Sequence, residues 1–273
     1  MKFAICQELF ESTPWPEQCR IIADIGYTGI EVAPFSIARD LSSVSGAQLA
    51  ELKTVAADHG LEIIGLHWLL AKTEGLYLTS PDSNVQARTA EYLRLLARTC
   101  AALGGDVLVF GSPQQRNLLP GIETEQAMEI AASVFRQATD EFDACKVKLC
   151  MEPLTQKETD FVNTCDQAAD LIKRVDHSQF ILHQDVKAMV GAETDSVPSL
   201  IHKYRDICGH FHVNDTNLLG PGMGDTDFVP ILNALHEVGY DGWVSVEVFD
   251  YSLGAENIAR DSMQHMQKIA ASL

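Results

Sequence analysis

Four side chains of metal-binding type stand near the ends of four short apolar runs in the second half of the chain. They are Glu152 in KVKLCMEP, Asp185 in QFILHQD, His212 in CGHFHVND and Glu247 in GWVSVEVF. Helix-length segments separate the runs. Because a parallel barrel gathers the carboxyl ends of its strands at one mouth, we expect these side chains to converge there. Three carboxylates and one imidazole suit one divalent ion, namely manganese, magnesium or zinc. The pattern therefore predicts a metal enzyme.

Short apolar runs of strand-like composition recur eight times along the chain. They cover residues 3–8, 29–34, 61–70, 106–112, 146–153, 179–185, 209–215 and 243–249. Segments between them, such as 83–103 and 124–142, carry apolar residues at helical spacing, typical of a parallel sheet covered by helices. Because no linker or charge block divides the chain, we predict an α/β fold with a single (β/α)8 TIM barrel over residues 1–273. A doubly wound open sheet is the alternative, but no GxGxxG follows the first run.

Residue types at the ends of the amphipathic segments indicate where the helices begin and end. We expect Ser83 and Asn84, and further along Thr124, to cap helix N-termini. Helices should stop at four glycines that precede strand-like runs, namely Gly26, Gly60, Gly104 and Gly239.

Side-chain alternation along the strands separates the expected ligands from their neighbours. In HFHVND, His210 and His212 face the same side of the strand, and His212 is nearer the mouth. The same alternation places His183 beneath Asp185, and Cys150 beneath Glu152. We therefore interpret His183 and His210 as hydrogen-bonded core residues rather than ligands.

Composition argues against several other classes of protein. The formal net charge of −18 disfavours binding to nucleic acid and to anionic membranes, because no cationic excess can replace phosphate counterions. Residues 1–10 lack the features of a secretory signal, and no run reaches membrane-spanning length. The seven cysteines fit reduced thiols, and Cys100, Cys145 and Cys150 fall in apolar patterns of the core. We expect a cytoplasmic protein.

Taken in strand order, the motifs resemble those of the xylose-isomerase-like TIM barrels, the sugar phosphate isomerase/epimerase superfamily. The resemblance spans the whole chain and rests on MEPLTQKETDFVNT with a second acid at Glu158, on HVND, on PGMGDTDF and on Glu247. It implies that Glu152, Asp185, His212 and Glu247 hold one divalent ion. It also implies that Glu152 and Glu247 act as the acid and base catalysts.

A site of this kind supports removal of a proton next to a carbonyl through a metal-stabilised enediolate. We predict a divalent-metal-dependent sugar isomerase or epimerase that acts on a keto-sugar or sugar derivative by carboxylate-mediated proton transfer. The alternatives are a metal-dependent lyase or dehydratase acting on a keto-glycoside or inosose, and a non-catalytic sugar-binding barrel. Retention of all four ligands and Glu158 argues against the non-catalytic barrel. The substrate, the native ion, the reaction direction and the oligomeric state, a homo-oligomer included, stay open.

Two departures from the resembled pattern bear on the substrate. Ketose 3-epimerases carry a histidine where this chain has Ala188 and an arginine where it has Leu218. Both normally hold substrate oxygens, so we expect poor activity on free ketohexoses. The apurinic-site endonuclease branch is excluded, because its metal cluster needs the missing histidine and an Asp-x-His where this chain reads Asp225-Thr226-Asp227.

Further residues at the expected mouth are candidates for second-shell or substrate-binding roles. They are Glu8, Glu31, His67, Trp68, Arg116 and Lys187, beside Glu158. His67 and Arg116 are expected to touch substrate, Trp68 to stack on a sugar or close the site, and Arg116 and Lys187 to hold a charged substituent. The alternatives are hydrogen bonding behind the site for His67, helix capping for Glu8 and Glu31, and core packing for Trp68.

Overall fold

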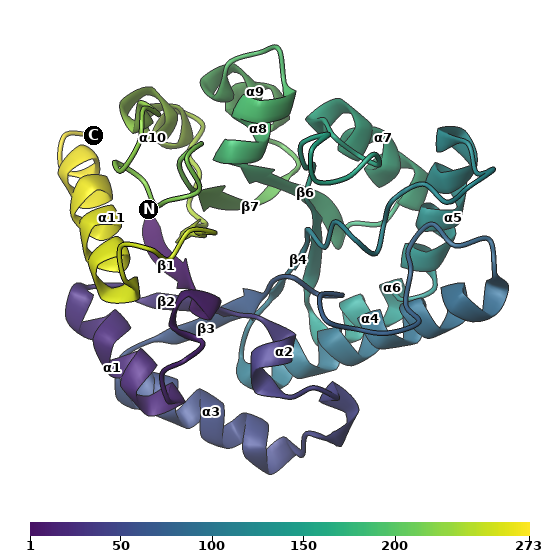
Figure 1. Cartoon of the computed structure of the whole chain (residues 1–273), viewed down its shortest axis with the longest axis horizontal. Coiled ribbons are helices and arrows are strands. Elements are labelled where there is room, and N and C mark those ends of the chain that lie inside the picture. Colours follow the sequence, from purple (N-terminus) through teal and green to yellow (C-terminus); the bar gives the residue numbers. More distant parts are fainter.

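The eight predicted strands close into one parallel barrel in the computed structural model, which describes residues 1–273 (Figure 1). Each strand pairs with its neighbours in sequence, and the last strand pairs with the first. The strands are β1 (Lys2–Cys6), β2 (Gly29–Val32), β3 (Glu62–Leu66), β4 (Val107–Phe110), β5 (Lys148–Met151), β6 (Phe180–Asp185), β7 (Cys208–Val213) and β8 (Trp243–Val246). The prediction of a single (β/α)8 barrel is confirmed.

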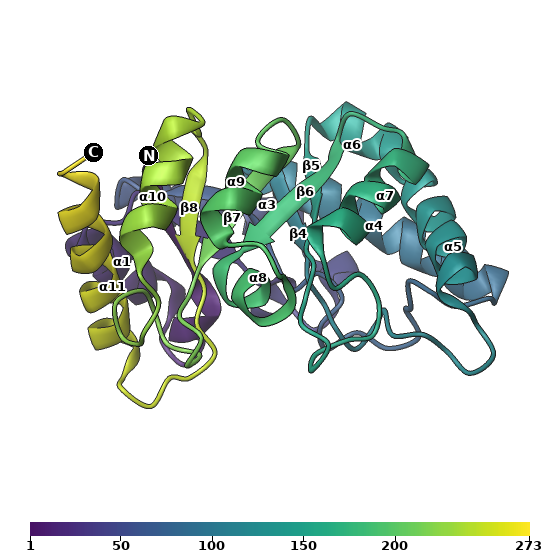
Figure 2. The ribbon, with the colours of Figure 1, turned by 90° about the horizontal axis from the view of Figure 1, so that it is seen from above.

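Helices surround the barrel and cover the outer faces of the strands (Figure 1). They are α1 (Trp15–Ile25), α2 (Pro34–Ile37), α3 (Gly46–Asp58), α4 (Ser83–Leu103), α5 (Thr124–Arg136), α6 (Thr139–Cys145), α7 (Cys165–Val175), α8 (Val186–Ala192), α9 (Val197–Tyr204), α10 (Phe228–Glu237) and α11 (Ala255–Ala270), with 3-10 turns η1 (Gln7–Phe10) and η2 (Leu41–Ser43). Figure 2 shows the connections that follow β7 and β8 on the same side of the molecule as α8. None of the helices combines the length and apolar character that crossing a bilayer requires.

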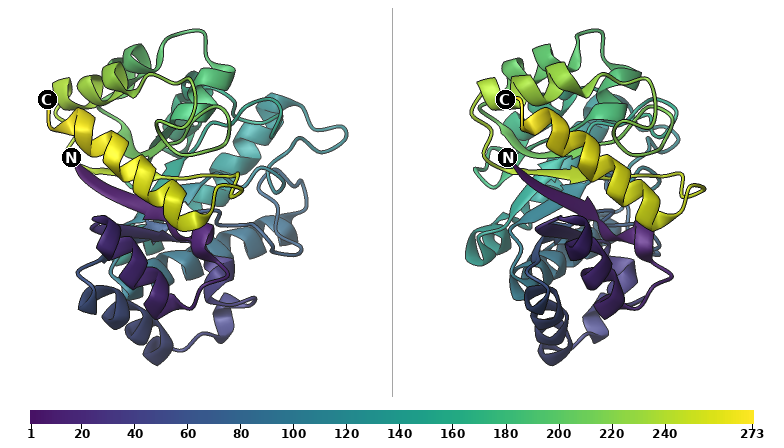
Figure 3. Two further views of the ribbon diagram at one scale, coloured as in Figure 1. Left: turned by 60° about the vertical axis from the view of Figure 1, so that its left-hand side comes forward. Right: turned by 90° about the vertical axis from the view of Figure 1, so that its left-hand side faces the viewer.

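The last helix closes the outer ring. Helix α11 packs between α1 and α10, and the N- and C-termini lie near each other beside it (Figure 3). Its Ile258, Met263 and Met266 are buried in the main core cluster of 65 residues. The helices therefore form a continuous ring around the barrel. An active site is expected at one end of the barrel, because its sides are covered.

Helix boundaries agree with the sequence at most positions. Helix α4 covers 83–103 as predicted, but its N-cap is Asp82, whose carboxylate accepts a hydrogen bond from the amide of Asn84. The expected caps at Ser83 and Asn84 are therefore wrong, by one and two residues. The expected cap at Thr124 is also wrong, because Thr124 begins α5 and the preceding Glu123 occupies the N-cap position without a side-chain bond.

The expected helix over 124–142 is divided into α5 and α6. The hydroxyl of Thr139 donates to the carbonyl of Arg136 at 2.9 Å, where a continuing helix would need main-chain bonds. Such side-chain bonds compete with the helix ladder and favour a break.

The four expected stop glycines all have positive φ, from +71° at Gly239 to +113° at Gly26.

Alternate residues of each strand fill the barrel interior in layers. Toward the amino ends of the strands, Trp243 packs with Ala4 and Ile64, and Gly29 lies directly against the indole. A Cβ atom at Gly29 would come within 2.6 Å of that ring, so only glycine fits there. The same alternation brings Glu31 and Ser245 into the layer above, below the predicted ligands.

Candidate metal centre and active site

The four predicted ligands lie at the carboxyl ends of β5 to β8, and all four are buried. Glu152 follows β5, Asp185 ends β6, His212 lies near the end of β7, and Glu247 follows β8. Asp185 and His212 are register partners in the parallel ladder, which fixes them side by side. This end of the barrel is where side chains from several strands can meet.

These side chains approach one another closely enough to share an ion. Ligand atoms of Glu152, Asp185 and His212 lie within 4.8 Å of one another, and His183 completes that group. Glu247 is outside it, but its Oε2 lies 3.2 Å from Nδ1 of His212. Two ligands held at about 2.1 Å and at right angles on one ion are about 3 Å apart, so this spacing suits a shared ion. The donor set therefore fits a divalent cation.

Asp185 is held in place from two sides. Its Oδ2 accepts from the amide of Asn214 at 2.5 Å, and its Oδ1 accepts from the main-chain N–H of Ala188 at 2.7 Å, which caps α8. The Asn214 carbonyl oxygen accepts from the main-chain N–H of Lys187. Asn214 belongs to the HVND motif, but its contact with Asp185 was not anticipated from the sequence.

Glu247 accepts hydrogen bonds from residues that follow β3. Its Oε1 accepts from Nε1 of Trp68 at 2.9 Å and lies 3.3 Å from Nδ1 of His67. The other ring nitrogen of His67 lies 2.8 Å from Oε2 of Glu8. Trp68 adopts φ +53° and stacks on Phe249 with ring centroids 6.3 Å apart. His67 is fully buried between two carboxylates, so it orients Glu247, and the expected substrate contact by His67 is wrong.

The carboxylate of Glu152 packs against the main chain at Gly111, directly after β4. A Cβ atom added to Gly111 would lie 1.7 Å from Oε2 of Glu152, so the carboxylate occupies space that only glycine leaves free. Arg116 donates to the main-chain carbonyl of Glu152 at 2.7 Å and is fully buried. This placement contradicts the expected substrate contact by Arg116, because its guanidinium faces the carbonyls behind the site instead of the mouth.

A lysine and a glutamate form an ion pair at the mouth. Nζ of Lys187 donates to Glu158 Oε1 at 2.7 Å and lies 4.0 Å above the ring of Phe249. These three residues line a pocket of about 460 Å³ together with Thr155, Lys157, Gly191, Thr216 and Leu218. None of the four expected ligands lines this pocket, but its residues follow β5, β6, β7 and β8 directly, and the charges of Asp185 and Glu247 act on its Lys187. It is therefore the candidate substrate pocket.

The two histidines below the ligands differ in their surroundings. His210 is buried, and its Nε2 lies 2.9 Å from Oε2 of Glu31, as expected of a hydrogen-bonded core residue. His183 is also buried, but neither ring nitrogen has a hydrogen-bond partner, and its Nε2 lies 3.9 Å from Oε1 of Glu152. The expected hydrogen bond of His183 is therefore wrong, while its position beneath the ligands is right.

Burial and neighbouring charges shift the pKa values of Glu152 and Glu247 in opposite directions. Burial, with Glu247 and Asp185 nearby, raises the pKa of Glu152 well above its usual value. Glu247 is equally buried, but the charge and hydrogen bonds of His212 and a hydrogen bond from His67 hold its pKa well below the usual value. Carboxyl groups whose pKa values are driven apart are suited to acid and base roles.

Comparison with known proteins identifies the family of the chain. Residues 19–269 match the family described as xylose isomerase-like TIM barrel. The chain belongs to this family. It is 29% identical over 232 residues to the D-psicose 3-epimerase of Ruminiclostridium cellulolyticum, which covers 84% of this chain and 76% of the relative. A 3-dehydro-D-guloside 4-epimerase of Escherichia coli is 30% identical over 116 residues, or 41% of this chain and 43% of the relative.

Solved structures of the family share the fold. A crystal structure of D-psicose 3-epimerase in the presence of D-fructose superposes with a TM-score of 0.86 at 21% identity, covering 98% of this chain and 99% of that chain. The similarity in fold therefore extends over the whole barrel.

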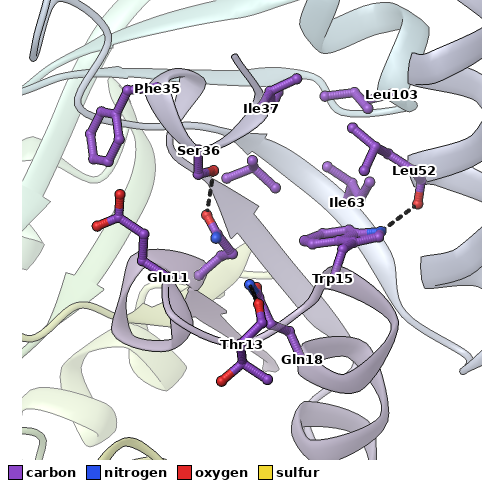
Figure 4. Close-up of a pocket in the computed structure, with 12 residues that line it drawn as sticks. Glu11, Thr13, Trp15, Gln18, Phe35, Ser36, Ile37, Leu52, Ile63 and Leu103 are labelled. Carbon is purple, nitrogen blue, oxygen red and sulfur yellow. Dashed lines mark hydrogen bonds between the residues drawn. The ribbon is translucent and has the colours of Figure 1, made fainter. Parts of the chain in front are cut away.

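A second cavity, of about 310 Å³, lies among residues of η1, α2 and the beginning of α1 (Figure 4). Trp15 donates from its indole to the carbonyl of Leu52, and Ser36 donates to the side chain of Gln7 (Figure 4). No expected ligand lines this cavity. It is therefore not the candidate active site.

Proposed function

We propose that this protein is a divalent-metal-dependent epimerase that inverts a carbon next to the carbonyl of a keto-sugar or sugar derivative. The observation that carries the proposal is the convergence of Glu152 and Glu247 with Asp185 and His212 at the barrel mouth. Membership in the family and similarity to a D-psicose 3-epimerase over most of the chain support it. A carbohydrate substrate is implied by the same relatives.

The two glutamates divide the proton transfer between them. In the metal-free protein Glu247 is ionised and accepts hydrogen bonds that fix its orientation, so it is the group prepared to take a proton from carbon. The pKa of Glu152 is raised by burial and by the nearby Glu247 and Asp185, and we assign to this residue the return of a proton. Delivery to the opposite face of the same carbon produces the epimer.

A divalent ion held by Glu152, Asp185, His212 and Glu247 would polarise the substrate carbonyl and so acidify the neighbouring C–H bond. Manganese, magnesium and zinc all accept this mixture of carboxylate and imidazole ligands, and we propose manganese or magnesium first because three of the four donors are carboxylates.

Lys187 and Glu158 are the polar groups that meet the substrate beside the reacting carbons. Lys187 has three N–H bonds, of which one is used by Glu158, so others are free for substrate oxygens. Burial lowers the pKa of Lys187, but Asp185 and Glu158 outweigh burial and raise it, which keeps the ammonium charged. A charged donor at this place would stabilise negative charge on a substrate oxygen during proton transfer.

The walls of the mouth pocket favour a substituted sugar. Leu218 lines the pocket and is 43% exposed, and Ala188 is buried beside Asp185. Neither offers a side-chain donor at positions where the ketose 3-epimerase pattern has one, so the pocket is less polar there. One sequence relative is named for a dehydro-guloside, which is a glycoside. We therefore propose a keto-glycoside as the preferred substrate class.

Exchange of solvent deuterium into a sugar panel tests the proposed reaction. The protein, reconstituted with Mn²⁺ or Mg²⁺, should incorporate deuterium next to the carbonyl of at least one ketose or keto-glycoside and form its epimer, both visible by NMR. Glu247→Gln serves as the matched control, since it should bind the ion but exchange no proton. Absence of exchange with every sugar tested would rule the proposal out, and an eliminated product in place of an epimer would identify a lyase.

A further inference from the structure

A buried carboxylate in the layer below the expected ligands receives two imidazole rings. Oε2 of Glu31 lies 2.9 Å from Nε2 of His210 and 3.1 Å from Nε2 of His212. Glu31 is fully buried, and its other oxygen has no hydrogen-bond partner. All of the hydrogen bonding of this carboxylate is therefore directed at the two rings.

Hydrogen-bond chemistry then assigns the protons on both rings. An ionised carboxylate can only accept, so each Nε2 that faces Glu31 must carry hydrogen. The other nitrogen of His212, Nδ1, lies 3.2 Å from Oε2 of Glu247, and it is the nitrogen that must give up its proton when the ring binds the ion. The ring of His212 is therefore turned with the nitrogen that can bind the ion toward Glu247.

The carboxylate also keeps His210 away from the mouth. His210 lies one layer below His212 on the same face of β7, and its Nε2 is occupied by Glu31. The register of β2 against β3 shifts between Ile30 and Glu31, and such irregularities re-aim the side chains that follow. The shift lies at the residue that reaches across the barrel to β7.

We propose that Glu31 is a positioning residue that fixes the tautomer and orientation of His212 for the metal ion and keeps His210 from competing for it. The inference rests on the metal site of the proposed function. Carboxylates that accept from the second nitrogen of a ligating histidine typically change metal affinity by about 10–100-fold when they are removed.

Titration of the metal-free protein with Mn²⁺ alone tests the positioning role. Glu31→Gln replaces the shared carboxylate oxygen with a neutral amide oxygen, which holds the two N–H donors more weakly because charge-assisted hydrogen bonds are about twice as strong as neutral ones. We expect the dissociation constant of Mn²⁺, measured by calorimetry, to rise about 10–100-fold. His210→Gln is the matched control, because its amide N–H can still donate to Glu31, and its dissociation constant should stay within about threefold of the wild-type value.

A second readout follows the tautomer directly. In protein labelled with ¹⁵N-histidine and loaded with Zn²⁺, His212 should carry its proton on Nε2, and Glu31→Gln should shift the Nε2 signal, because that N–H then faces a neutral oxygen. If Glu31→Gln does not fold, Glu31→Asp replaces it, since the retracted carboxylate should weaken Mn²⁺ binding while circular dichroism stays native. Unchanged Mn²⁺ affinity together with an unchanged Nε2 signal of His212 would overturn the proposal, as would loss of Mn²⁺ binding in His210→Gln.

Failure of the proposed function would give a different result. A protein that binds Mn²⁺ but turns over no sugar leaves the role of Glu31 intact, because calorimetry measures the ion alone. If the protein epimerises sugars but Glu31→Gln leaves the Mn²⁺ affinity unchanged, the proposed role of Glu31 is refuted and the proposed reaction stands.

Discussion

Gly111→Ala should disable the site through a single methyl group. The new Cβ atom would lie 1.7 Å from Oε2 of Glu152 and 2.9 Å from its carboxyl carbon, whereas real Cβ atoms stay beyond 3.0 Å of such neighbours. The oxygen must therefore retreat by more than 1 Å. The main chain of Glu152 has little freedom to follow, because its N–H bonds to Phe110 and its carbonyl to Arg116.

The size of the effect follows from the displacement. A misplacement of about 1 Å at a catalytic group costs on the order of 100-fold in rate, so kcat/KM for sugar epimerisation should fall about 100-fold or more. Mn²⁺ affinity should weaken as well, because Glu152 is an expected ligand. The fold should persist, since the clash is local to the mouth.

Gly46→Ala is the matched control, because a Cβ atom at Gly46 meets nothing within 4 Å and the residue begins α3. Its kcat/KM, Mn²⁺ dissociation constant and melting temperature should all stay close to the wild-type values. The reasoning is refuted if Gly111→Ala is folded and keeps more than half of the wild-type kcat/KM, since Glu152 would then have no need of its observed position.

Four further results are expected. Glu152→Gln and Glu247→Gln should each abolish turnover while changing Mn²⁺ affinity less, because an amide still coordinates but takes no proton; deuterium exchange and calorimetry check this. Glu158→Gln should be milder in the same exchange assay, as its partner lysine stays in the mouth. His212→Ala should lose most Mn²⁺ binding in metal analysis, and retention of a stoichiometric ion would contradict its role as a ligand. For free fructose, tagatose and psicose, kcat/KM should stay below about 10⁴ M⁻¹s⁻¹, and a value in the ordinary enzyme range would refute the expectation of a substituted substrate.

Local pattern was enough to predict the barrel and to select the four expected ligands. Each ligand ends an apolar run, and strand alternation places Glu152, Asp185, His212 and Glu247 on the inner face at one end of a parallel barrel. The layer beneath them, with Cys150, His183 and His210, follows from the same two-residue period. These features depend only on neighbours along the chain, so the sequence contains them directly.

Contacts across the barrel were decided by the tertiary structure. Glu31 meets His210 over a separation of 179 residues, and Gly111 makes room for Glu152 from the neighbouring strand. Register shifts within β2–β3 and β6–β7 alter which layer a side chain enters, and strand periodicity does not reveal them.

The conformations of the loops at the mouth were also decided by the tertiary structure. Arg116 was expected to touch substrate, but the connection after β4 folds back and buries its guanidinium against the carbonyls of Glu152 and Val162. Trp68 reaches Glu247 because its backbone takes a positive φ that its residue type does not predict. The sequence by itself determined which strand ends carry chemically active groups, and only the closed barrel determined which partners hold those groups in position, because pairing across the interior depends on strand stagger and loop conformation.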